Sequence, residues 1–173
     1  MTRPLRIAQV APVGTSVPPR LSGSIETMTS VITEGLVARG HEVTLFATGD
    51  STTSARLTSL FPRGYRDDPL MWPWEMCELF NLAAACERAA EFDVIHCQAA
   101  YAPMSLGLSR LSGGRLLHTV HHSPSPLEVA LWQRYPEQPF VAVSQDQARR
   151  LDGLNVVGVI PHGLDMQQFP FRA

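Results

Sequence analysis

The stretch RIAQVAPVGTSVPPRLSGSIETM, residues 6–28, decides how the fold of this chain is read. It opens with a short apolar run that ends at a proline, which is the pattern of a buried strand. The loop that follows, residues 12–23, is longer than the usual strand-to-helix connection of ~2–6 residues, and such loops are often functional. Residues 24–39 then predict a helix with one apolar face, formed by Ile25, Met28, Ile32 and Leu36.

The remaining sequence repeats this alternation of apolar runs and helical segments. Further apolar runs lie at 42–48, 92–98, 115–122, 140–144 and 155–163, whereas residues 49–74 have no clean period. Continuous apolar strands separated by helices indicate a parallel sheet that is covered on both faces. We therefore predict an α/β fold, a three-layer Rossmann-like domain with a mainly parallel sheet of about six strands.

The expected domain covers residues 1–165, and residues 166–173 are expected to begin a linker to a missing C-terminal domain. Phe169 and Phe171 flank a proline near the end of the sequence, and exposed aromatic side chains need a surface to cover them. A tail that folds back on its own domain is the open alternative.

Composition excludes several classes of protein. A hydrophobic content of 45% with 17% charged residues is typical of a globular chain, and a net charge of −2 gives no attraction to nucleic acid or to an anionic membrane. The three cysteines form an odd set without metal-type spacing, which favours reduced thiols. No apolar run suits a signal peptide or a membrane helix, so we expect a cytoplasmic protein without an integral membrane segment.

Unusual residues follow several of the predicted strands. Ligands of open parallel sheets bind beyond the carboxyl ends of the strands, so residues at these ends are expected to meet at one site. They are Gly14, Gly23 and Ser24 after the first strand, Gln98 and Tyr101 after 92–98, His121 and His122 after the next strand, and Ser144 after 140–144. The agreement of four strand ends favours a binding site at this edge.

The loop before the first helix has two interpretations. With Gly23 before the helix and Ser24 at its start, free backbone N–H groups would form an anion site. The spacing does not fit G-x-G-x-x-G, which argues against a nicotinamide cofactor. A plain capped turn, with Glu26 in the first turn of the helix, is the alternative.

The histidines do not predict a metal site. In a strand, His118 and His122 would lie on one face and His121 on the other, so the three cannot converge. His118 and His96 are expected to be packed and hydrogen-bonded, whereas His121 stands at a strand end over the predicted cleft. The sequence has no nucleophile elbow, P-loop or HExxH motif, and the spacing of Glu26 and Glu34 carries no catalytic weight.

Several motifs, in this order, resemble the N-terminal half of a family 4 glycosyltransferase, a retaining enzyme with two Rossmann-like domains (GT-B architecture). PPRLSGSIE resembles the family's P…GG-x-E loop, with Ser24 at the second glycine, and LVARGHEVTLFATG resembles its L…RGHEVTV stretch. DVIHCQ, HTVHH and VAVSQDQARRL resemble the next three strand regions. VIPHGLDMQQF resembles VIPNGVD…F, with His162 in place of asparagine.

The resemblance implies a carbohydrate-biosynthesis transferase of the hexosyltransferase type. A sugar would pass from a nucleotide-sugar to an acceptor hydroxyl with its configuration kept, without a metal or other cofactor. Gly23 and Ser24 would contact the donor phosphates and sugar, and His121 would be the catalytic residue. The acceptor-side candidates are Gln98, Tyr101, His122 and Ser144.

The resemblance also implies that the absent C-terminal domain, in cis, holds most of the nucleotide. This chain alone would then be inactive or nearly so. The alternative is a non-catalytic Rossmann-like module that binds a sugar or a phosphorylated small ligand.

Overall fold

The computed structural model describes residues 3–99, 103–110, 113 and 115–163. Within these residues the strands form one seven-stranded sheet in the order β3-β2-β1-β4-β5-β6-β7, and every neighbouring pair is parallel. The strands are β1 (Arg6–Val10), β2 (Glu42–Phe46), β3 (Arg56–Thr58), β4 (Val94–Cys97), β5 (Leu116–Val120), β6 (Pro139–Ala142) and β7 (Asn155–Val159). The predicted Rossmann-like α/β fold is confirmed, and β3 is the strand that the sequence did not indicate.

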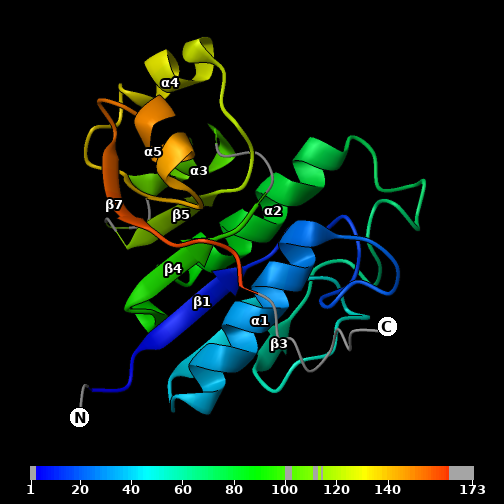
Figure 1. Ribbon diagram of the computed structural model, residues 1–173. Helices are drawn as coiled ribbons and strands as arrows, with labels where there is room; N and C mark the ends of the chain where they lie inside the picture. The colour runs from blue at the N-terminus through cyan, green and yellow to red at the C-terminus, as the bar shows by residue number, and fades with distance from the viewer. Residues whose placement is uncertain (1–2, 100–102, 111–112, 114, 164–173) are drawn as a thin grey trace, which may run out of the picture.

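The helices cover both faces of this sheet (Figure 1). They are α1 (Ser24–Ala38), α2 (Trp74–Glu87), α3 (Pro103–Ser109), α4 (Pro126–Trp132) and α5 (Gln145–Arg150), with a 3-10 turn η1 (Ala89–Glu91) after α2. The chain first moves from β1 to β2 and β3, then returns past β1 and runs from β4 to β7. Because parallel crossovers are right-handed, this order places α1 on one face and α2 to α5 on the other.

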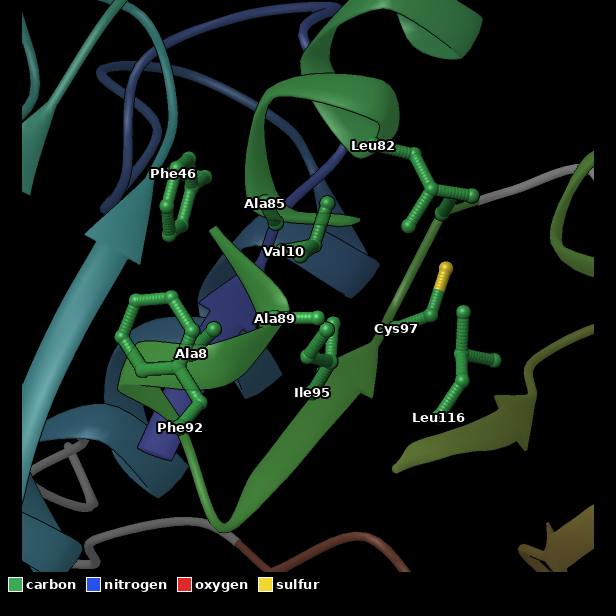
Figure 2. Packing of buried hydrophobic residues seen from close by; sticks show 11 residues of the cluster. Ala8, Val10, Phe46, Leu82, Ala85, Ala89, Phe92, Ile95, Cys97 and Leu116 are labelled. Atoms are coloured by element: carbon green, nitrogen blue, oxygen red, sulfur yellow. The ribbon is translucent and has the colours of Figure 1, made fainter. Parts of the chain in front are cut away.

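The main hydrophobic core lies between the sheet and α2 (Figure 2). Phe46 meets Phe92 edge-on at 5.9 Å between ring centres. A second core lies under α4 and α5, where Trp132 stacks on Phe140 at 5.6 Å. These two cores fix the strands whose carboxyl ends carry the candidate site.

The apolar face predicted for α1 is only partly used in the core. Its fully buried residues are Glu26, Met28, Thr29 and Thr33. Ile32 and Leu36 are half-buried and line an apolar groove of about 480 Å³ between α1 and the neighbouring strands. The sheet extends past α1 to β7, so this side of the helix faces the groove rather than the core. No helix in the described parts of the chain has the length and apolar character needed to cross a membrane.

The irregular segment 49–74 is held against the loop between β1 and α1. The Thr52 N–H donates to the Val17 carbonyl at 2.8 Å, and the Tyr65 N–H donates to the Val13 carbonyl at 3.1 Å. A Cβ on Gly64 would clash with backbone atoms of this loop, so only glycine allows the approach. The loop 12–23 and the segment 49–74, which is irregular outside β3, are therefore held together.

Candidate functional site

Three side chains meet at the carboxyl edge of the sheet, two of them, His121 and Gln98, at predicted positions and the third, His162, at a position that was not predicted. His121 follows β5, Gln98 follows β4, and His162 lies shortly after β7. The Nε2 atom of His121 lies 2.7 Å from Oε1 of Gln98, and its Nδ1 atom lies 3.2 Å from Nε2 of His162. Both ring nitrogens of His121 thus have a partner.

These contacts assign the state of the His121 ring. The Gln98 oxygen can only accept, so Nε2 of His121 carries the proton and donates it, and Nδ1 is left as an acceptor for His162. Burial lowers the pKa of His121 to about 3, and the charge of His162 acts in the same direction. His121 is therefore a neutral imidazole that offers hydrogen bonds rather than charge.

A second histidine lies beneath this group and fixes Gln98. Nε2 of His96 lies 2.8 Å from the Thr119 hydroxyl, and the Gln98 amide nitrogen lies within 3.3 Å of both His96 ring nitrogens. The Gln9 amide nitrogen contacts the same ring at 3.2 Å. Burial lowers the pKa of His96 to about 4, so the chain of side chains from Thr119 to His121 is uncharged.

The loop before α1 contains an unexpected side chain. Glu26 is buried, and its carboxylate lies where side chains on Gly14 and Gly23 would stand: a Cβ on Gly23 would be 2.7 Å from its Oε2 atom, and a Cβ on Gly14 would be 3.2 Å from its Oε1 atom. Burial raises the pKa of Glu26, while a hydrogen bond from its own backbone N–H opposes this. The absence of a side chain at Gly23 thus makes room for the carboxylate of Glu26.

A second buried carboxyl group supports the same loop. Glu78 of α2 is 1% exposed, and its Oε1 atom accepts a hydrogen bond of 3.0 Å from the Val13 N–H. Burial raises the pKa of Glu78 to about 8, although the bond from Val13 lowers it and the charge of Glu26 raises it further. The loop therefore rests on two carboxyl groups that bind protons more tightly than exposed ones.

The N-terminus of α1 opens into a pocket of about 390 Å³ that Gly23, Ser24 and Arg66 help to line. Gly23 at the cap position has no side chain to bond the first N–H groups of the helix, and one of these, the Glu26 N–H, bonds the Glu26 carboxylate, which also lines this pocket. Ser24 is exposed at this opening. The arrangement suits a negatively charged ligand group.

The sequence matches Glycosyltransferase Family 4 over residues 25–168, which is most of the chain. The chain belongs to this glycosyltransferase family. No curated protein matches the sequence. Among solved structures, the fold resembles the crystal structure of AviGT4, a glycosyltransferase involved in avilamycin A biosynthesis, with a TM-score of 0.56 and 22% identity.

That likeness covers 94% of this chain but only 43% of AviGT4. At this identity it shows the shared α/β fold. The family 4 domain described here thus spans less than half the length of that structural neighbour, and the resemblance drawn from the sequence motifs is confirmed at the level of family and fold.

The other predicted residues of the glycosyltransferase domain lie around the same edge. His122 contacts Glu128 of α4 at 3.1 Å, on the opposite side of the sheet from His121, as strand alternation predicts. The Ser144 hydroxyl accepts the Gln147 N–H at 3.0 Å and caps α5. Tyr101 falls outside the described residues.

Gln98 takes a different position from the one expected of an acceptor contact. Its side chain is completely buried and reaches the site through His121. Its place in the structure is that of a residue that orients the imidazole. The predicted contact with an acceptor stays a prediction.

Sequence reasoning missed several residues that build the domain's site. Gln147 is buried and donates to the carbonyl oxygens of Val120 and His122 at 2.9 and 2.8 Å, which fixes the backbone around His121. Glu78 sits in the middle of a helix, where a glutamate ordinarily indicates a solvent-facing position. His162 could have been found, because it follows a strand end like the residues that were predicted. In the described part of the chain, no three His, Cys, Asp or Glu side chains come close enough to hold a metal ion.

Proposed function

We propose that this family 4 domain is the acceptor-side half of a retaining glycosyltransferase. The complete enzyme would move a sugar from a nucleotide-sugar donor to an acceptor hydroxyl. The observation that carries this proposal is the neutral His121, held by Gln98 at the carboxyl edge of the sheet. A site at this edge is where open α/β sheets bind their ligands.

The chemistry follows from the charges at this edge. A neutral imidazole can orient a sugar by hydrogen bonding, but it cannot stabilise the charge that develops on the leaving diphosphate. That charge would be met by the N–H groups at the start of α1, around Gly23 and Ser24, two residues that line the adjoining pocket. For Nδ1 of His121 to reach a sugar, the exposed His162 must move aside.

The proposal also assigns the missing half of the enzyme. A second Rossmann-like domain in cis, giving a GT-B architecture, would hold the nucleotide and close over the sugar to exclude water. The comparison of lengths supports this part of the proposal, because this chain covers only 43% of AviGT4. Alone, the chain would be inactive or nearly so. A hexosyl donor, the absence of a metal or other cofactor, and a cytoplasmic location stay predictions.

The first experiment is a titration of the ¹⁵N-labelled chain, followed by NMR, with UDP-, GDP- and ADP-glucose and with free sugars. We expect weak or no response to the nucleotides and a sugar response that is lost in His121→Ala. His41→Ala is the matched control, since His41 lies before β2, at the other end of that strand from the candidate site. Tight binding of a nucleotide by this chain would instead favour the non-catalytic binding module.

A second experiment tests the reaction. The full-length protein is incubated with nucleotide-sugars, and the anomeric configuration of any product is read by NMR. Retention is expected, with product lost in His121→Ala. An inverted product, or full activity of the 173-residue chain alone, would contradict the proposal.

A further inference from the structure

A second polar pocket lies beside the N-terminus of α1, between the loop 12–23 and the segment 49–74. Its volume is about 680 Å³. The charged and hydroxyl side chains in its lining are Thr15, Arg20, Ser22, Asp50, Arg63, Arg66 and Asp67. Three guanidinium groups and two carboxylates share this hollow, so its lining is net positive in a chain whose net charge is −2.

We propose that this pocket binds a phosphate group carried by the acceptor, and that Arg63 and Arg66 are the residues that hold it. The acceptor would be a phosphorylated sugar or polyol. This inference rests on the proposed function and names the substrate class of the same site.

The backbone that carries the two arginines is fixed. They flank Gly64, which contacts the loop after β1 so closely that no side chain fits there. The Arg66 N–H donates to the Gly14 carbonyl at 3.1 Å, and the turn closes with a bond of 2.9 Å from the Asp67 N–H to the Gly64 carbonyl. A ligand would therefore meet a preformed turn, which lowers the entropy cost of binding.

The two proposed phosphate-binding residues, Arg63 and Arg66, have positive charge available for a phosphate. Arg20 is paired with Asp50 at 3.6 Å, and Asp50 also accepts the Thr48 hydroxyl at 2.7 Å. Arg63, by contrast, makes no ion pair with any other described residue. Within the part of the chain that the structure describes, the only hydrogen bond of the Arg66 side chain is a long one of 3.5 Å to the Ser22 carbonyl.

The carboxyl groups near Arg66 do not remove this charge. Glu26 and Glu78 lie close enough to interact with Arg66 electrostatically, but burial raises the pKa of both. With a pKa of about 8, Glu78 holds a proton at neutral pH and so does not neutralise the guanidinium. A phosphate suits such guanidiniums, because each can donate two parallel hydrogen bonds to its oxygens.

The pocket adjoins the proposed site of the donor phosphates. It shares Ser22 and Arg66 with the smaller pocket at the start of α1. An acceptor whose phosphate lies on Arg63 and Arg66 would extend its hydroxyl groups toward that smaller pocket. Asp67 and the Thr15 hydroxyl can accept hydrogen bonds from the other hydroxyls of a sugar.

The test compares glucose 6-phosphate with glucose in an NMR titration of the chain. We expect the phosphate to improve affinity by about tenfold or more, and Arg63→Gln or Arg66→Gln to remove most of that gain. Arg149→Gln is the matched control, since Arg149 is an exposed arginine of α5 that pairs with Asp146. Equal affinity for the two sugars, or equal loss in the control, would overturn the proposal.

A second arm separates a free phosphate from one on a lipid. Phosphatidylcholine vesicles with and without phosphatidic acid are added to the same variants. A response to glucose 6-phosphate that requires Arg63 and Arg66 supports the proposal, and an additional response to phosphatidic acid shows that the same arginines accept a phosphate on a lipid. A response to phosphatidic acid alone overturns the phosphorylated sugar or polyol as acceptor. No response in either arm overturns it.

The failures of the two proposals are distinguishable. If the full-length protein glycosylates a neutral acceptor as well as its phosphorylated form, the acceptor inference is wrong and the transferase remains. If phosphate binding depends on Arg63 and Arg66 but no nucleotide-sugar supports transfer, the site remains and the proposed reaction is wrong.

Discussion

Replacing Glu78 with glutamine tests the buried carboxyl group that supports the loop between β1 and α1. Glutamine keeps the size of the side chain and an oxygen that can accept the Val13 N–H, and it replaces the buried Oε2 atom with an amide NH2 group that does not titrate. Glu78 is 1% exposed, and burial raises its pKa to about 8. The substitution therefore isolates the cost of ionising this group inside the protein.

The sign of the effect follows from the direction of the shift. A carboxyl group with a raised pKa in the folded state holds its proton more tightly there than in the unfolded chain. Its stabilisation is complete below the unfolded value of 4.5 and is lost as the pH rises to about 8. Each pKa unit corresponds to about 1.4 kcal/mol, so the loss between pH 5 and pH 8 can reach about 4 kcal/mol. Local rearrangement and water entry lower it, and we expect about 2–4 kcal/mol.

The measurement is urea unfolding, followed by circular dichroism, at several pH values from 5 to 8. The free energy of unfolding of the wild type should fall with pH more steeply than that of Glu78→Gln. The two proteins should differ most at pH 8, where the variant is the more stable. Glu87→Gln, exposed on the same helix, should run parallel to the wild type. A constant offset between Glu78→Gln and the wild type at every pH would refute the argument, because packing changes alone produce such an offset.

Three further predictions concern the same region. Gly64→Ala should destabilise the chain by about 3 kcal/mol or more in urea unfolding, because its Cβ would clash with the backbone of the β1–α1 loop, whereas Gly107→Ala, with open space around its Cβ, should not. The imidazole of His121 should show no titration between pH 8 and pH 5 by NMR, since its pKa is lowered to about 3; a midpoint near 6 would contradict its burial. Gln147→Leu should lower the free energy of unfolding by about 2–4 kcal/mol, because it leaves buried backbone groups unpaired. The same change at the exposed Gln145 should lower it far less, and similar losses in the two variants would contradict this.

Most of the sheet could be predicted because its strands are buried on both faces. Such strands are continuous apolar runs, and the chain between them has helical spacing. The strand β3 escaped detection since it is three residues long, lies at the sheet edge and contains Arg56 and Thr58. The apolar face of α1 was recognised from the sequence. How deeply that face is buried could not be predicted, because it depends on the width of the sheet that α1 covers, and this width is set by the whole topology.

The candidate site divides in the same way. His121 and Gln98 were accessible to sequence reasoning, since the carboxyl ends of parallel strands must share one edge. Glu78 and Gln147 were not, because each belongs to a helix and acts on a loop or strand end far along the chain: Glu78 bonds a backbone group 65 positions away, and Gln147 bonds one 27 positions away. A helix pattern identifies an apolar face but gives no reason to single out one polar residue within it.

Gly23 shows why the residue type alone did not settle the role of the loop. Its missing side chain suggests that a ligand approaches the backbone, yet the atom that a Cβ at this position would meet first belongs to the carboxylate of Glu26. A substitution such as Gly23→Val would displace Glu26 as well as any ligand, so loss of binding in that variant has two causes. His121→Ala leaves this loop untouched, which makes it the cleaner probe of the transfer site. The anion site proposed at α1 and the arginine pocket beside it are best separated through Arg63, whose side chain makes no ion pair among the described residues that its removal would break.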